Sequence, residues 1–322
     1  MIYSLIIPVY KNEQNIPRLL VALEDLNQKL GSALECVFIV DGSPDKSFEI
    51  LKQNLQISSF GSQLIAHSRN FGSFPAIRTG LHAAKGIYLA VMAADLQEPP
   101  ELILAFFKAL AADECDVTIG TRNGRNDPLL SRITSYLFWQ FYKKMIVPEM
   151  PEGGVDIFGC NKVFCEELLK LEESRSSLVA LVFWLGFRRK FISYERLIRL
   201  EGKSAWTFFK KIDYMMDSIF AFTDLPIRLL TRVGMFGCMI SVLLGIIIVL
   251  AKLTGNVSVP GYAATMLVVL FFGTLNIFGL GLVGTYAWRG YENTKKRPMA
   301  IVSLIQEFQG RPNETSNKNS SQ

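Results

Sequence analysis

Two long uncharged stretches near the carboxyl end constrain this chain more than any other feature. Residues 233–251 and 253–288 contain no charged side chain, and Lys252 stands alone between them. A helix rises about 1.5 Å per residue, so the first stretch alone would cross the roughly 30 Å core of a bilayer. The sequence therefore predicts a membrane hairpin of two transmembrane α-helices at residues 232–290.

The charge and polarity of the chain are divided unevenly along its length. Its 322 residues include 34 Lys and Arg against 29 Asp and Glu, a formal charge of +5, with a mean hydropathy of +0.26. Most of the charge lies in residues 1–231, which have ordinary globular composition. These values exclude an intrinsically disordered chain, a disulfide-stapled miniprotein and a multi-pass channel or carrier. We expect a globular domain tethered by two helices.

The numbers and positions of cysteines and histidines limit which disulfides and metal sites the chain can form. The five cysteines are scattered in apolar segments without a CxxC pair, which indicates reduced core thiols. Two histidines are too few for a multi-histidine metal site. Any metal would be held by oxygen ligands, which favours Mg²⁺ or Mn²⁺.

Short apolar runs alternate with helical patterns over the first 120 residues. Strands are predicted at 4–9, 36–40, 63–66, 87–92 and 116–120, and helices at 16–30, 48–55, 75–84 and 101–111. This alternation predicts an α/β fold with a parallel sheet. Polar side chains follow five of these strands, at the edge where ligands bind in open parallel sheets.

Later segments predict a second set of elements. We expect helices at 129–146 and 161–187, a strand at 190–194, and an amphipathic interfacial helical segment at 201–231 that mixes aromatics with lysines. A plain core helix is the alternative for that segment. The predicted division is a catalytic domain at 1–200, the interfacial segment, the hairpin, and a tail at 291–322 that is disordered at its polar end, after Ile305.

The hairpin turn near residues 255–261 is uncharged, whereas basic residues lie at the other ends of both stretches. The positive-inside rule then places the globular domain and the carboxyl terminus in the cytoplasm. We predict an integral protein of the cytoplasmic membrane.

The strongest local motif is Ala94-Asp95-Leu-Gln97-Glu98, directly after a predicted buried strand. Asp95 and Gln97 offer two oxygen ligands on one side of a turn, which suits a hard cation bridging a diphosphate. The alternative is an ordinary turn before a helix that begins at the following prolines.

Two earlier turns have the same position after a strand. The turn Asp41-Gly-Ser43-Pro-Asp45 could accept hydrogen bonds from a base or ribose, although an unremarkable turn is equally compatible. His67-Ser-Arg69-Asn-Phe-Gly72 supplies a cation and a glycine where backbone can approach phosphate.

Together these motifs, with Pro8-Val-Tyr10-Lys-Asn-Glu13 and Gly202-Lys203-Ser204, resemble family 2 glycosyltransferases of the GT-A (Rossmann-like) fold. The two predicted spans narrow the resemblance to the polyprenyl-phosphate glycosyltransferases: bactoprenol glucosyltransferases, dolichol-phosphate mannose synthases and undecaprenyl-phosphate aminoarabinose transferases. The resemblance implies roles residue by residue. Nucleotide-sugar binding would fall to Pro8, Tyr10, Glu13, Asp41, Ser43, Arg69 and Asp95; metal binding to Asp95 and Gln97; catalysis to Asp95 and Asp156; and lipid-phosphate binding to Arg122, Arg132, Arg199, Lys203 and Ser204.

The chain departs from the family pattern at three positions. Val40 stands where an aspartate is frequent, Ala93 replaces the first carboxylate of the usual Asp-x-Asp, and Ala205 replaces a common lysine. We therefore expect a weaker or rearranged metal contact, with Glu98 as a compensating ligand.

The implied activity is inverting transfer of a sugar to polyprenyl (undecaprenyl) phosphate at the cytoplasmic membrane face. UDP-glucose is the first choice of donor, and GDP-mannose or a UDP-aminoarabinose type remains open. The expected partners are the donor, the lipid acceptor and the membrane; no nucleic acid is expected, and homo-oligomerisation through the hairpin stays open. A nucleotide-sugar-binding subunit of a transport or assembly complex is the alternative from another class, but neither span carries the ionisable residues that carriers need.

Overall fold

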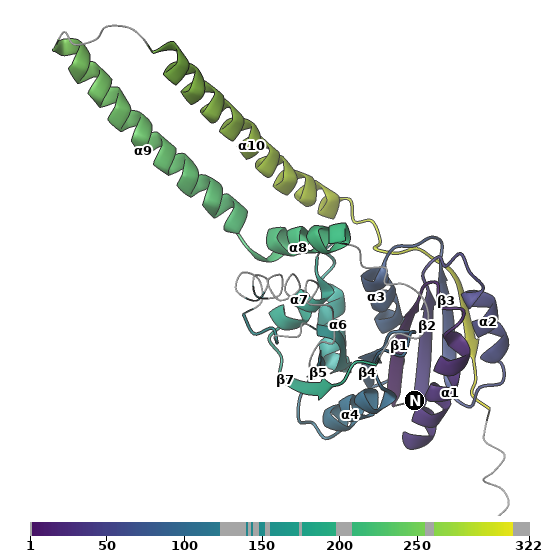
Figure 1. Ribbon diagram of the computed structural model, residues 1–322. Helices are drawn as coiled ribbons and strands as arrows, with labels where there is room; N and C mark the ends of the chain where they lie inside the picture. Colours follow the sequence, from purple (N-terminus) through teal and green to yellow (C-terminus); the bar gives the residue numbers. More distant parts are fainter. Residues whose placement is uncertain are drawn as a thin grey trace, which may run out of the picture. The chain divides into compact units, whose positions relative to one another are not determined.

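The computed structural model describes residues 2–122, 140, 143, 148–151, 155–173, 176–197, 208–254 and 261–311. These residues form two compact units. The first comprises residues 1–173, 177–211 and 298–322, and the second is mainly residues 212–297. Figure 1 labels most of the helices and strands of both.

The first unit alternates strands and helices as the sequence predicts. Its strands are β1 (Tyr3–Val9), β2 (Leu34–Val40), β3 (Gly61–His67), β4 (Tyr88–Val91), β5 (Val117–Arg122), β6 (Val155–Asn161), β7 (Arg189–Tyr194) and β8 (Val302–Phe308). Its helices are α1 (Ile16–Lys29), α2 (Ser47–Asn54), α3 (Ser73–Ala83), α4 (Pro100–Ala111), α6 (Lys162–Lys170) and α7 (Leu178–Trp184). The nine strands and helices predicted before residue 121 are all present.

One sheet joins these strands in the order β7-β5-β6-β4-β1-β2-β3-β8. The prediction of a parallel sheet is wrong in part, because β6 runs antiparallel to β4 and β5, and β8 runs antiparallel to β3. The sheet is therefore mixed. The sequence pattern predicted no strand at the positions of β6 and β8, so neither entered the predicted series of parallel βαβ units.

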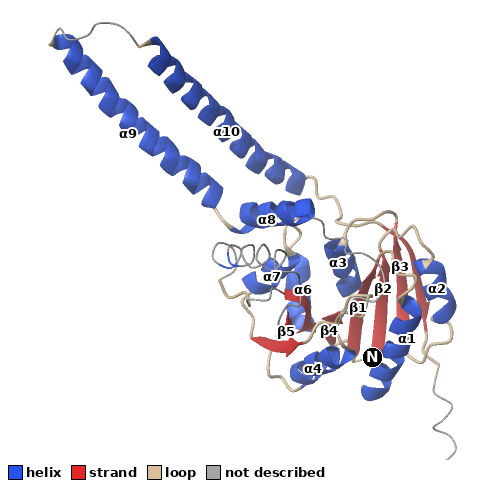
Figure 2. Cartoon of the chain, viewed as in Figure 1, coloured by secondary structure: helices blue, strands red, loops and turns tan. Residues whose placement is uncertain are grey.

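Helices cover both faces of the sheet (Figure 2). Residues of α1, α2 and α4 share one buried cluster with alternate residues of β1 and β2, such as Leu5 and Phe38. The intervening Ile6 and Ile39 face α3, where a Cβ on Gly80 would come within 2.4 Å of Ile6. This close helix-to-sheet approach requires glycine at position 80.

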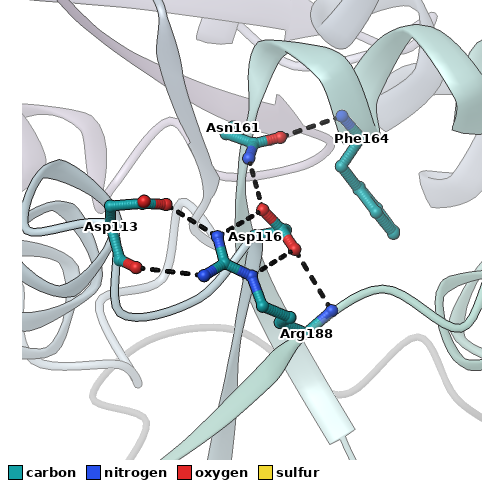
Figure 3. A network of polar contacts seen from close by, with 5 residues as sticks. All are labelled: Asp113, Asp116, Asn161, Phe164 and Arg188. Carbon is teal, nitrogen blue, oxygen red and sulfur yellow. Dashed lines mark hydrogen bonds and ion pairs between the residues drawn. The ribbon is translucent and has the colours of Figure 1, made fainter.

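A polar network holds the amino-terminal ends of β5 and β7 together (Figure 3). Arg188 donates hydrogen bonds to the carboxylates of Asp113, at 2.6 Å, and Asp116, at 3.0 Å. Asn161 donates to Asp116 and caps α6 by accepting from the backbone of Phe164. The Arg188 guanidinium lowers the pKa of Asp116. The network anchors the far end of the strands whose carboxyl-side residues are site candidates.

The region after α6 differs from the prediction. The prediction of a continuous helix at 161–187 is wrong, because α6 ends at Lys170 and α7 begins only at Leu178. Ser177 accepts a hydrogen bond from the backbone of Ala180 and so begins a new helix. The predicted strand at 190–194 is confirmed by β7, whereas most of the predicted helix at 129–146 lies outside the described residues.

The second unit is helical. It contains α9 (Leu225–Leu253), α10 (Tyr262–Thr294) and most of α8 (Phe208–Phe222). Arg289 of α10 donates a 2.6 Å hydrogen bond to Asp217 of α8 and lies over the ring of Phe220. Within the described part of the chain, residues 271–294 are long and apolar enough to cross a membrane. The second predicted span remains a prediction. The segment predicted as one interfacial stretch, 201–231, contains the end of α8 at Phe222 and the start of α9 at Leu225.

The chain returns to the first unit at its carboxyl end. β8 pairs with β3, and Lys85 forms a 2.7 Å ion pair with Glu307. The prediction of a disordered tail after Ile305 is wrong for residues 306–308, which belong to β8. Residues 312–322 lie outside the described range.

Candidate functional site

The turns after β1 and β2 are linked by reciprocal hydrogen bonds. The backbone N–H of Lys46 donates to the Glu13 carboxylate at 2.9 Å, while the N–H of Glu13 donates to Asp45 at 3.1 Å. Ser43 accepts from the backbone of Lys11 and donates to Asp45. The structure thus brings the predicted residues Glu13 and Ser43 together at one edge of the sheet.

Asp45 is the centre of this link. Partial burial raises the pKa of Asp45, but hydrogen bonds from Ser43, Ser47 and Glu13 together lower it below its ordinary value. An ionised carboxylate accepts hydrogen bonds and cannot donate them, so the charge matches its donors. Asp45 ends the turn that the sequence indicated after the second strand, four residues after Asp41, but no individual role was predicted for it.

Asp41 lies deeper than a ligand-binding side chain in an open turn would. It is 3 % exposed, and its two oxygens accept hydrogen bonds from the backbone of Phe71, at 2.9 Å, and Gly72, at 2.7 Å. The ring of His67 lies 2.8 Å from the same carboxylate through Nδ1 and 3.0 Å from Thr79 through Nε2. Asp41 therefore holds the turn that follows β3.

Gly42 allows the two turns to meet. Its φ is +57°, and a Cβ there would lie 2.3 Å from the backbone carbon of Arg69. Both the backbone conformation and the close approach exclude larger residues. The contact brings the backbone of Arg69 against the turn after β2.

The side chains of Arg69 and Tyr10 are exposed at this edge. The Arg69 guanidinium lies 4.1 Å from the centre of the Phe71 ring and donates to the carbonyl of Asn70. Tyr10 is 36 % exposed, directly after β1, and Pro8 pairs with Ile39 inside the sheet. A cation and an aromatic face are suitable for a phosphate and a base, respectively.

A further turn follows β4, the strand that pairs with β1 on the side opposite β2. Asp95 is partly exposed and accepts a 3.3 Å hydrogen bond from the backbone of Gln97, while Leu96 between them has a φ of +54°. Glu98 is 2 % exposed, and its carboxylate accepts from the backbone of Ala93 at 3.3 Å. The Glu98 carboxylate therefore lies beside the position where the family's other aspartate is missing.

Gln97 is contacted by a segment far away in the sequence. Arg196 donates a hydrogen bond to the side-chain oxygen of Gln97, and the backbone N–H of Leu197 donates to the Gln97 carbonyl at 2.9 Å. Sequence analysis missed Arg196. The sequence offers only one indication of its role, which is that a basic residue stands two positions after a predicted strand.

The donor set of this turn decides what kind of metal site fits. The described residues contain no cluster of three or more Asp, Glu, His or Cys side chains that could hold an ion. Mg²⁺, however, is commonly bound by one or two carboxylates together with substrate phosphates. Asp95 fits a metal that shares its coordination with a diphosphate, and does not by itself make an all-protein metal site.

The predicted acceptor residues are described only in part. Arg122 ends β5 and pairs in register with Tyr194 of β7, and Thr121 pairs with Val155, next to Asp156 in β6. The backbone thus places Arg122, Asp156 and the segment carrying Arg196 at one end of neighbouring strands. Arg132, Arg199, Lys203 and Ser204 lie outside the described residues.

Comparison with known proteins gives a consistent result. Residues 4–171 match the sequence family described as "Glycosyl transferase family 2". The uncharacterized glycosyltransferase sll0501 of Synechocystis sp. is 30% identical over 301 residues, covering 93% of this chain and 94% of that protein. The bactoprenol glucosyl transferase of Shigella phage SfV is 29% identical over 300 residues, covering 93% and 97%.

One solved structure shows a weaker similarity to this chain. The glucosyl-3-phosphoglycerate synthase from Mycobacterium tuberculosis, in complex with Mn²⁺, uridine diphosphate and glucosyl-3-phosphoglycerate, is 13% identical with a TM-score of 0.44. The alignment covers 68% of this chain and 77% of that one.

Proposed function

The chain belongs to glycosyltransferase family 2, and from that premise we propose that this transferase moves glucose from UDP-glucose to polyprenyl (undecaprenyl) phosphate at the cytoplasmic membrane face. The observation that carries the proposal is near full-length similarity to a bactoprenol glucosyl transferase. That similarity extends over both the Asp95 turn and the apolar helices. A soluble acceptor would not require those helices.

The donor would lie across the turns after β1, β2, β3 and β4. Tyr10, Asp41 and Ser43 lie on the side proposed for the nucleoside, and Arg69 supplies positive charge for its phosphates. A Mg²⁺ or Mn²⁺ ion, held by Asp95 and in our proposal by Gln97, would neutralise charge on the departing diphosphate. Glu98, beside Ala93, is the proposed compensating carboxylate.

The proposed acceptor, a lipid phosphate, needs little general acid–base catalysis. A phosphate monoester is already largely ionised near neutral pH, because its second pKa is about 6. Its oxygen can attack the anomeric carbon directly, so positioning and charge stabilisation account for catalysis. We assign Asp156 to orienting the acceptor, with general base as the weaker alternative, and Arg122, Arg132, Arg199, Lys203 and Ser204 to the lipid phosphate. In-line attack would turn an α-linked donor into a β-linked product.

Membrane attachment is proposed through both α9 and α10. Each is longer than the roughly 20 residues that a span requires, and both expose large apolar side chains, among them Met235, Phe236, Phe278 and Leu280. Arg289 and Lys295 lie near the carboxyl end of α10, which agrees with a cytoplasmic location for that end.

A panel of radiolabelled nucleotide sugars with undecaprenyl phosphate tests the proposal. The full chain in detergent–lipid micelles should transfer label to an organic-extractable product, fastest from UDP-glucose and only with Mg²⁺ or Mn²⁺. Transfer from GDP-mannose instead would change the donor and keep the reaction. Nucleotide binding without transfer from any donor would favour the binding-subunit alternative.

A further inference from the structure

Arg196 joins two segments that the proposed chemistry uses separately. Its Nη2 group donates to the side-chain oxygen of Gln97, in the turn that carries Asp95. The next residue, Leu197, donates its backbone N–H to the Gln97 carbonyl at 2.9 Å. Beyond Leu197 the chain continues toward Arg199 and Lys203, which the sequence analysis assigned to the lipid phosphate. The turn that carries Asp95 and the segment Arg196–Leu197 are therefore joined at Gln97.

The contact also bears on metal binding. Gln97 is 9 % exposed, and the oxygen predicted to coordinate a cation already accepts a hydrogen bond from a guanidinium. An arginine keeps its charge in proteins, so a divalent ion at that oxygen would lie beside a fixed positive charge. Two cations so close repel each other unless an anion lies between them. Arg196 therefore disfavours a bare metal ion at this turn.

A bound diphosphate would turn the repulsion between Arg196 and the metal ion into a joint attraction. Its oxygens attract both the metal ion and the guanidinium, and arginine can bind phosphate through two parallel N–H groups. A guanidinium has five N–H donors, and the bond to Gln97 uses the Nη2 group.

We propose that Arg196 is a positioning residue for a metal–diphosphate complex: it orients Gln97, weakens binding of the bare divalent ion and strengthens binding of the ion together with a nucleoside diphosphate. The inference rests on the proposed function, because it presumes a nucleotide-sugar donor. Its consequence is cooperative entry of metal and nucleotide. A residue that merely held the fold would not separate these two binding reactions.

The test measures Mn²⁺ binding by electron paramagnetic resonance on the full chain, with and without UDP, and UDP binding by calorimetry. Arg196→Met keeps the aliphatic stem without charge, and Arg196→Lys keeps the charge without the planar fork. Lys190→Ala is the matched control, since Lys190 lies in β7, the strand that ends two residues before Arg196, and pairs with Glu114.

In Arg196→Met we expect bare Mn²⁺ to bind several-fold more tightly and UDP with Mn²⁺ about tenfold more weakly, the order of one charged hydrogen bond. Arg196→Lys should fall between, and Lys190→Ala should match the wild type. Unchanged UDP–Mn²⁺ binding in Arg196→Met would overturn the inference. So would a parallel loss of both affinities with a lowered melting temperature, which indicates a structural bond only. Wild-type protein that binds neither UDP nor GDP would instead overturn the proposed function.

Discussion

Two aspartates follow the two strands that flank β1 in the same sheet, and their surroundings differ. Asp41 comes after β2 and Asp95 after β4, on opposite sides of β1. Asp41 is 3 % exposed and receives hydrogen bonds from the backbone of Phe71 and Gly72, whereas Asp95 is partly exposed in a turn contacted by Arg196 through Gln97. Both aspartates come directly after a strand, so that position does not distinguish a carboxylate that holds a loop from one that binds a ligand. The backbone N–H groups of Phe71 and Gly72 that donate to Asp41 make the distinction.

The turns after β2 and β4 therefore differ in what their aspartates do. The Asp41 turn organises the backbone around Arg69 and Gly72, so its carboxylate serves mainly by shaping the loop. The Asp95 turn keeps a carboxylate partly open to solvent, as a metal–diphosphate complex requires. Substitutions should therefore separate them: one should affect stability, the other activity.

The largest expected effect is that of Asp95→Asn. Removing the charge should lower divalent-dependent sugar transfer by about a thousandfold, the order seen when one electrostatic stabiliser is lost. The melting temperature should stay within about 2 °C, because the side chain is partly exposed. The measurement is the radiolabel assay together with a thermal melt.

Asp113→Asn is the matched control, since Asp113 is a surface carboxylate in the Arg188 network. Its transfer rate should equal that of the wild type. Retained metal-dependent transfer in Asp95→Asn would contradict the assignment of Asp95.

Asp41→Ala should have the next largest effect, on stability. The change leaves the backbone donors of Phe71 and Gly72 and the ring of His67 without their acceptor in a buried position, at a cost of about 3 kcal/mol. At about 2–4 °C per kcal/mol, the melting temperature should fall by roughly 6–12 °C. A thermal melt of the full chain in lipid–detergent micelles measures it.

A double variant sharpens this result. If His67 acts through Asp41, adding His67→Ala to Asp41→Ala should lower the melting temperature by less than the sum of the single changes. A normal melting temperature in Asp41→Ala, with loss of nucleotide binding, would instead make Asp41 a direct ligand.

The smallest effect concerns pH and Asp45. Because hydrogen bonds lower the pKa of Asp45 in the folded chain, its ionised form stabilises the fold above the unfolded pKa of about 3.9. That contribution is lost as the pH falls through the lower folded-state pKa. The melting temperature of wild type should therefore fall more steeply below about pH 4 than that of Asp45→Asn, by about 1 °C.

The measurement is a series of thermal melts between pH 6 and the lowest pH at which the protein stays soluble. Asp25→Asn is the control, since Asp25 lies on the surface of α1 in an exposed pair with Lys29. Equal slopes for wild type and Asp45→Asn would contradict this prediction, because they would mean that folding does not lower the pKa of Asp45.

The amino-acid sequence determined much of this protein by itself. Local apolar periodicity predicted the strands and helices of the first 120 residues, since burial on a sheet or helix face repeats every two or 3.6 residues. The motifs around Asp95 and Asp41 indicated the family, and uncharged stretches predicted two long apolar helices. The assignment of Asp156 and of the lipid-phosphate residues stays a prediction.

Tertiary structure decided what depends on which distant segments meet. Gln97 and Arg196 are 99 residues apart, and β8 joins β3 only after the helical unit has intervened. Glu35, a charged residue in a strand, is 2 % exposed because Ser4, Gln63 and the backbone of Lys85 all donate to it. Local periodicity carries no information on such partners: a buried charge is stable only where folding supplies its donors.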